Sequence, residues 1–201
     1  MDNKTNVSSK DPSPLKLSPR YTEKHWNDAF DGREQWDAAI NIVEDRIKGR
    51  WLDAADQLLD EPNSGFAILA LDCIVLESLW GFMNGRAVPK SQEQQVYQDI
   101  LKSPHFGLSA DVIEKFRGLV RNGIMHDAET RSRWVVEKTV PRQVIAQKNK
   151  RGDYVMNRTK FHRALKAAFG DWIKKLRDGD AAMRENLRKR MNEVIAKHYA
   201  P

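Results

Sequence analysis

Three side chains within six positions, those of Arg121, Asn122 and His126, offer more chemistry than any other group in this sequence. The histidine titrates near neutral pH and can serve as a general acid or base. The arginine keeps its charge and has a planar fork that suits phosphate, so it can stabilise a phosphorane. The asparagine can orient the imidazole or the scissile phosphate. Together these residue types indicate chemistry on a phosphodiester.

This group has no nucleophile of its own. The sequence also lacks paired Cys/His spacing for a metal and a phosphate-binding glycine loop. If the group is catalytic, the substrate must supply the nucleophile, as the ribose 2′-OH does in metal-independent RNA cleavage. We therefore expect RNA as the substrate, with no metal and no cofactor.

The spacing of the group is not an argument in itself, because Arg20 and His25 are spaced in the same way. A structural role is the alternative, in which Asn122 and His126 form the C-terminal cap of a helix and Arg121 lies on the surface.

The helix that carries these residues has two different faces. At about 100° per residue, its core face is apolar and consists of Phe116, Leu119, Val120, Gly123 and Ile124. The other face carries Arg121, Asn122 and His126, with Gly118 and Met125 between them. A small residue and a flexible apolar residue in the middle of a polar face suit close packing against another helix. We expect Gly118 and Met125 at the interface of a homodimer.

Five charged residues outside this group are further candidates. Glu77 and Asp72 lie in an apolar segment, and buried carboxylates need partners, so either could hold an arginine of the site or pair elsewhere in the core. Arg117, Arg131 and Arg133 flank the group and could bind RNA phosphates, or could be solvated surface residues.

The net charge of +6 is unevenly distributed. Residues 1–110 contain 12 Lys/Arg and 17 Asp/Glu, whereas residues 111–201 contain 22 and 11. A positive second half suits a polyanion such as nucleic acid, although it also fits a pair of solvated C-terminal helices. The single cysteine, Cys73, lies in an apolar run, which indicates a core thiol and a reducing, cytoplasmic compartment.

The longest apolar stretch runs from Phe66 to Met83. Because it contains Asp72 and Glu77, and charges are costly in lipid, we expect a buried core helix and no membrane association. Residues 1–20 lack the apolar region of a signal peptide and are rich in Ser, Pro and Lys, which predicts a disordered arm.

Helical periodicity dominates the rest of the chain. Helices are predicted at residues 34–59, 66–83, 91–102, 110–127, 158–179 and 180–198. We expect Ser91 with Gln94, Ser109 and Asn157 to cap helices. The fold class is mainly α, with one helical domain over residues 21–178, a small β-ribbon at about 131–156, and a basic C-terminal helix over 179–201. Trp134 and His162 are expected to pack inside the protein.

The stretch "RNGIMH", Arg121 to His126, resembles the Rx4-6H signature of HEPN domains. Three further blocks, "EDRIKGRWL", "GFAILALDCIVLESLWGFMNG" and "NRTKFHRAL", also resemble a prokaryotic HEPN family found on plasmids and mobile elements. The similarity covers roughly Tyr21 to Arg177, and Arg121, Asn122 and His126 match the arginine, polar residue and histidine of the motif.

This resemblance implies an antiparallel helical bundle that forms a homodimer with one composite cleft. It further implies a metal-independent endoribonuclease that acts as a toxin or defence effector, with an antitoxin or another defence partner. In one branch of the family a modified tyrosine follows the histidine by two positions, but Ala128 stands there in this chain. The alternative is a non-catalytic HEPN module that binds RNA, a nucleotide or a partner protein.

Overall fold

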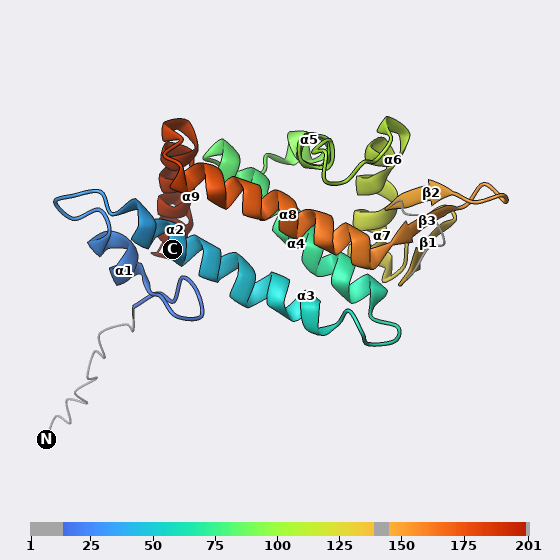
Figure 1. Ribbon diagram of the computed structural model, residues 1–201, viewed down its shortest axis with the longest axis horizontal. Helices are drawn as coiled ribbons and strands as arrows, with labels where there is room; N and C mark the ends of the chain where they lie inside the picture. Colours follow the sequence, from blue (N-terminus) through green and yellow to red (C-terminus); the bar gives the residue numbers. More distant parts are fainter. Residues whose placement is uncertain (1–13, 139–144, 200–201) are drawn as a thin grey trace, which may run out of the picture.

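The computed structural model describes residues 14–138 and 145–199, and within them the protein is mainly helical with a small sheet at one end (Figure 1). The α-helices are α1 (Glu23–Asp28), α2 (Trp36–Ile47), α3 (Asp53–Gln57), α4 (Gly65–Asn84), α5 (Glu93–Leu101), α6 (Ala110–Lys115), α7 (Asn122–Asp127), α8 (Arg158–Arg177) and α9 (Ala181–Tyr199). The prediction of a mainly α protein with a small β element is confirmed.

Helix α4 is the centre of the fold. It packs against α5, α8 and α9, and against the π-helical segment η1 (Lys48–Leu52) that joins α2 to α3. Its length and composition would suffice to cross a membrane, but its buried residues include Leu69, Cys73 and Leu76 in the main core cluster. The predictions of a core helix and a core thiol are therefore confirmed.

Two of the predicted helices are interrupted by π-helical turns. Segment η1 lies inside the helix predicted at residues 34–59, and η3 (Phe116–Arg121) lies inside the one predicted at 110–127, between α6 and α7. A π-turn holds more residues than the 3.6 of an α-helix, and such turns occur frequently at functional sites. Residues that follow η3 therefore lag behind the positions that a regular helical wheel assigns to them.

The predicted β-ribbon forms three short strands, β1 (Trp134–Glu137), β2 (Ala146–Lys148) and β3 (Tyr154–Asn157), in the order β1-β3-β2. Strands β2 and β3 are antiparallel, but β1 pairs with β3 in parallel. The sheet is therefore more than a hairpin. Trp134 is 4% exposed and stacks on Tyr154 at 4.7 Å between ring centroids, so it is a core residue as expected.

Two of the three predicted helix caps form. The side chain of Ser109 accepts a hydrogen bond from the Val112 backbone, and that of Asn157 accepts one from the Lys160 backbone at 2.9 Å. The expected capping box of Ser91 and Gln94 is wrong, because Ser91 lies within the 3-10 turn η2 (Lys90–Gln92) before α5.

The expectation of a disordered arm over residues 1–20 is wrong for residues 14–20, while residues 1–13 lie outside the described part. Leu17 and Ser18 are fully buried. Asp45 on α2 holds this segment, since it accepts hydrogen bonds from the Ser18 hydroxyl at 2.7 Å and from the Arg20 backbone and side chain. Burial works against ionisation of this carboxylate, but these hydrogen bonds and the Arg20 charge lower its pKa.

The C-terminal helix is part of the same folded unit and not a separate segment. Helix α9 lies across one end of the bundle and packs against α4, with Leu187 and Met191 fully buried (Figure 1). The boundary expected after residue 178 is therefore only a turn between α8 and α9.

The charge imbalance between the two halves of the sequence is largely removed by pairing between them. Acidic side chains of the first half bind basic side chains of the second half in the pairs Glu34–Arg188, Glu44–Arg177, Asp56–Lys166, Asp60–Lys138, Glu77–Arg121 and Glu93–Arg117. The uneven sequence charge thus produces contacts inside one molecule, and it is weaker support for a polyanion-binding field than the residue counts suggest.

Candidate functional site

The predicted site lies where η3 passes into α7. Arg121 is the last residue of η3, Asn122 is the first of α7, and His126 is close to its C-terminal end. Helix α7 stops at Ala128, which adopts the left-handed conformation with φ 55° and donates its backbone N–H to Gly123. The chain then folds back, and the Arg131 backbone donates to the Leu119 carbonyl at 2.7 Å. The site therefore lies on a short helix that backbone hydrogen bonds hold in place.

Arg121 is held by the central helix. Its Nε donates to Glu77 Oε1 at 3.0 Å, and the Tyr97 hydroxyl on α5 donates to the same oxygen at 2.6 Å. Partial burial works against the Arg121 charge, but Glu77 and Tyr97 outweigh it and raise the pKa of the guanidinium. Burial raises the pKa of Tyr97 far above its ordinary value, so the phenol stays protonated and keeps donating. Arg121 is thus a fixed cation with a side chain 22% exposed.

Asn122 and His126 lie on the open side of this group. The Asn122 side-chain oxygen accepts a hydrogen bond from Arg121 Nη1 at 3.2 Å, which leaves Arg121 Nη2 without a hydrogen bond to the described residues. His126 is exposed, and its ring makes no hydrogen bond to any residue in the described ranges. One chain therefore joins Arg121 to Asn122 but leaves His126 unconstrained.

The π-helical turn explains why Arg121 is less exposed than the regular wheel predicts. A 100° wheel places Arg121 opposite the core face, whereas the structure turns its side chain toward α4 and Glu77. Phe116 and Val120 occupy the core face as expected, since both are fully buried.

Gly118 and Met125, expected at a dimer interface, lie on open surface in the single chain. Met125 is 47% exposed, which makes it one of the most exposed large hydrophobic side chains among the described residues. A Cβ added at Gly118 would meet no atom within 4 Å, so nothing in the chain itself requires glycine there.

Gly123 is a site residue that a regular helical wheel places only on the core face. A Cβ at this position would lie 2.4 Å from the Glu129 carbonyl oxygen and 3.1 Å from the Arg131 backbone nitrogen. Only glycine therefore lets residues 129–131 fold back over α7. Tyr97 is the other missed residue, and no local signal marks it, because its side chain reads as part of the apolar face of α5.

Replacing Gly123 by alanine should lower the free energy of unfolding by about 2–3 kcal/mol, because backbone atoms cannot move aside as a flexible side chain can. Gly118→Ala is the matched control on the same helix, and its effect should stay within about 1 kcal/mol and tend toward stabilisation. Urea unfolding measures both, and equal effects would contradict the close approach at Gly123.

The two carboxylate candidates have different partners. Glu77 contacts Arg121, whereas Asp72 contacts neither Arg121 nor Arg117 and instead binds the buried His162 at 2.7 Å. His162 also lies 3.2 Å from Asp56, so two carboxylates contact its imidazole. It is a buried helix residue, as expected.

The three flanking arginines are each engaged within the chain. Arg117 pairs with Glu93, Arg131 with Asp127, and Arg133 with Asp153 at 3.0 Å. An RNA phosphate would have to compete with these carboxylates. The contacts therefore favour the alternative that the three arginines are ordinary surface side chains and do not bind RNA phosphates.

The second Arg/His pair with the same spacing has a different role. His25 lies in α1, where its Nδ1 accepts a hydrogen bond from the Thr22 backbone at 3.1 Å, and Arg20 binds Asp45. Within the described ranges, no cluster of three or more His, Cys, Asp or Glu side chains could hold a metal ion.

The chain matches no known family model, no curated protein and no solved structure.

Proposed function

We propose that this protein is a metal-independent endoribonuclease of the HEPN type that acts as a homodimer. The observation that carries the proposal is the state of Arg121. Glu77 and Tyr97 fix this guanidinium on a π-helical turn, and Asn122 accepts a hydrogen bond from its Nη1. Arg121 Nη2 forms no hydrogen bond within the described part of the chain and can bind a ligand. A fixed cation with a free donor beside an exposed histidine suits the charge that develops on a phosphate during transfer.

The reaction needs only groups of the protein and the substrate. His126 accepts the proton of the ribose 2′-hydroxyl, and this oxygen attacks the adjacent phosphorus. Arg121 stabilises the negative charge that develops on the phosphate oxygens. The bond between phosphorus and the 5′-oxygen breaks, and this oxygen takes a proton from the second subunit's copy of His126. The products carry a 2′,3′-cyclic phosphate and a 5′-hydroxyl.

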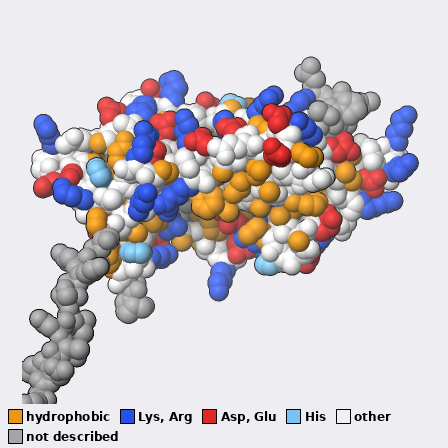
Figure 2. All heavy atoms as spheres, turned by 90° about the horizontal axis from the view of Figure 1, so that it is seen from below, with side chains coloured by type: hydrophobic (Ala, Val, Ile, Leu, Met, Phe, Trp, Pro, Cys, Tyr) orange, Lys and Arg blue, Asp and Glu red, His pale blue; other side chains and the backbone are white. Residues whose placement is uncertain are grey.

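A second subunit would also cover an apolar surface. Hydrophobic side chains gather over the middle of the face that lies beneath α3 and α4 in Figure 1, as Figure 2 shows. On α4, Ala67 is exposed and Ala70, Leu71 and Ile74 are partly exposed, at the spacing of one helix face. Helix α7, with Met125, packs beside α4. Burying such a face between two copies would bring two copies of the Arg121 group close together.

Cleavage of RNA in the presence of EDTA tests the activity directly. Purified protein should cut single-stranded RNA without added metal, and the fragments should carry 2′,3′-cyclic phosphate ends that acid converts to 2′- and 3′-phosphates. Cleavage that requires Mg²⁺, or fragments with 3′-hydroxyl ends, would rule out this mechanism. Binding of RNA without cleavage would favour a non-catalytic module. A toxin or defence role further requires that expression arrest growth and that an antitoxin or defence partner restrain it.

Gly118→Trp should convert the dimer to a monomer at micromolar concentration, because the indole would occupy the place of closest approach. Gly170→Trp on α8 is the matched control, since its Cβ also meets no atom within 4 Å and its helix lies outside the proposed interface. Light scattering measures the mass of each variant. A Gly118→Trp dimer as stable as the wild type would place the interface elsewhere.

A further inference from the structure

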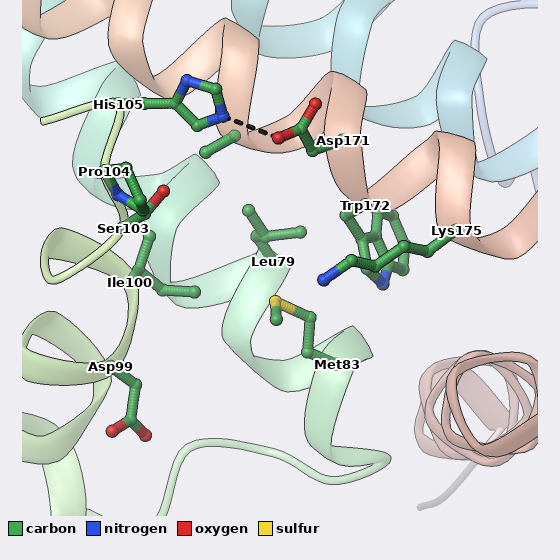
Figure 3. A pocket seen from close by; sticks show the side chains of 11 residues that line it. Leu79, Met83, Asp99, Ile100, Ser103, Pro104, His105, Asp171, Trp172 and Lys175 are labelled. Atoms are coloured by element: carbon green, nitrogen blue, oxygen red, sulfur yellow. Dashed lines mark hydrogen bonds and ion pairs between the residues drawn. The ribbon is translucent and has the colours of Figure 1, made fainter. Parts of the chain in front are cut away.

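A hollow of about 420 Å³ opens between α4, α5, α8 and the loop that follows α5, away from the Arg121 group (Figure 3). This volume falls within the range of small-molecule sites, roughly 300–1,000 Å³. Its floor is apolar and consists of Leu79, Met83, Ile100, Ala168 and Trp172. Such a floor favours the apolar body of a ligand over a fully polar one.

The acidic side chains at the mouth of the hollow already form hydrogen bonds within the protein. Asp171 lies 2.7 Å from His105 Nε2, and Asp99 accepts a hydrogen bond from Trp80 Nε1 at 2.8 Å. Lys175 is exposed at the same mouth and forms no ion pair with any residue of the described ranges. Lys175 is thus a cation at the mouth that a ligand can reach without breaking an ion pair to the described residues.

The wall of the hollow also contains a hydrogen-bond donor without an acceptor. Trp172 is 2% exposed, and its indole N–H is buried with no partner among the described residues. Figure 3 shows the indole nitrogen on the edge of the ring beside the Lys175 side chain. A buried N–H without an acceptor is unfavourable, and an incoming oxygen atom would remove that penalty.

Hydrolytic chemistry does not fit this hollow, although Ser103, His105 and Asp171 all line it. A serine nucleophile needs the free imidazole nitrogen as its base, but within the described ranges the Ser103 hydroxyl forms no hydrogen bond to His105, whose Nε2 lies 2.7 Å from Asp171. The hollow is therefore suited to binding.

We propose that this hollow binds a small monocarboxylate with an apolar body, such as a medium-chain fatty acid. Lys175 and the Trp172 N–H provide two donors for the two carboxylate oxygens, and the apolar floor receives the chain. A dianionic phosphate fits less well, because its second charge would have no partner beyond Lys175 among the described residues and the floor of the hollow is apolar. This site does not depend on the proposed nuclease activity.

Isothermal titration of the full chain with octanoate tests the proposal, with octanamide as the uncharged ligand of the same shape. Octanoate should bind with one site per chain, and octanamide about tenfold more weakly. Absence of saturable octanoate binding below about 10 mM, or equal affinity for the two ligands, would overturn the proposal. The rate of RNA cleavage should be the same whether or not octanoate binds.

Three variants locate the ligand. Lys175→Gln should weaken octanoate binding by about fivefold, and Trp172→Phe, which keeps the ring but loses the N–H, by about tenfold. Ala168→Phe should abolish binding because it fills the floor. Lys189→Gln on α9 is the matched control and should bind as the wild type does. If Lys175→Gln and Lys189→Gln behave alike, the carboxylate is not bound at this mouth.

Discussion

Replacing His126 by alanine should lower the rate of RNA cleavage by about two to four orders of magnitude. Among the described residues near Arg121, an imidazole is the type of side chain that can both accept and donate a proton near neutral pH. Because His126 is exposed and makes no hydrogen bond to the described residues, the substitution should leave the free energy of unfolding within about 0.5 kcal/mol of the wild type. A loss of cleavage would then report chemistry and not misfolding. Single-turnover cleavage of a labelled RNA measures the effect.

The chain contains its own control for this experiment. His25 follows an arginine at the same spacing, but it caps α1 through the Thr22 backbone. His25→Ala should therefore cleave RNA like the wild type. If His25→Ala and His126→Ala lose activity equally, or if neither loses activity, His126 is not the catalytic acid and base and the proposed mechanism is wrong.

Arg121→Lys sharpens the same experiment. Lysine keeps the positive charge but lacks the forked guanidinium. Only the guanidinium can hydrogen-bond Glu77 and Asn122 and at the same time bind a phosphate with its remaining nitrogen. We expect cleavage to fall by about 10²-fold or more, whereas Arg131→Lys, which changes an arginine paired with Asp127, should have little effect. Equal activity of both variants would mean that Arg121 acts only as a diffuse charge.

Replacing His162 by leucine should lower the free energy of unfolding by about 3–5 kcal/mol. His162 and Asp72 are both fully buried and lie 2.7 Å apart, and Asp56 binds the second imidazole nitrogen. The substitution leaves the Asp72 carboxylate buried without its hydrogen-bond partner, which is costlier than the loss of one contact. Urea unfolding followed by circular dichroism measures the change.

The double variant Asp72→Leu with His162→Leu separates lost packing from an unpaired charge. Removing both polar groups should recover most of the stability that His162→Leu loses, because no buried carboxylate is left alone. A double variant as unstable as the sum of the two single variants would show that His162 and Asp72 contribute independently, which would contradict the cost of an unpaired carboxylate.

The same network predicts how stability depends on pH. Burial works against protonation of His162, but the hydrogen bonds and charges of Asp72 and Asp56 outweigh it and raise its pKa above 6.5. A group whose folded pKa is raised contributes its full stabilisation below its unfolded pKa and loses it as the pH rises through the folded pKa. We therefore expect the wild type to lose stability as the pH rises above 6.5, and His162→Leu to lack this slope.

Local patterns in the sequence were sufficient for much of the secondary structure. Three features depend on interactions within a few residues, which a sequence displays directly: the apolar run of α4, the caps of Ser109 and Asn157, and the valines of β1 and β3. The same reasoning placed Trp134, Cys73 and His162 inside the protein, as the structure confirms.

The candidate site was only half visible in this way. Arg121, Asn122 and His126 could be named from their chemistry, but the partners that hold Arg121 could not, because Glu77 and Tyr97 lie 44 and 24 positions earlier in the chain. The π-helical turn of η3 also escaped prediction, since a regular wheel assumes 3.6 residues per turn throughout.

The sequence by itself determined most of the helices, the small β element, several buried side chains, and which three residues could act on a phosphate. Only the tertiary structure decided how the charges are used, because an ion pair between α4 and η3, or between α2 and α8, depends on helices that meet far from each other in sequence. For the same reason it alone showed that residues 14–20 and α9 belong to the core, that Asp72 serves His162 and not an arginine, and that a hollow with an unpaired indole N–H lies beside Lys175.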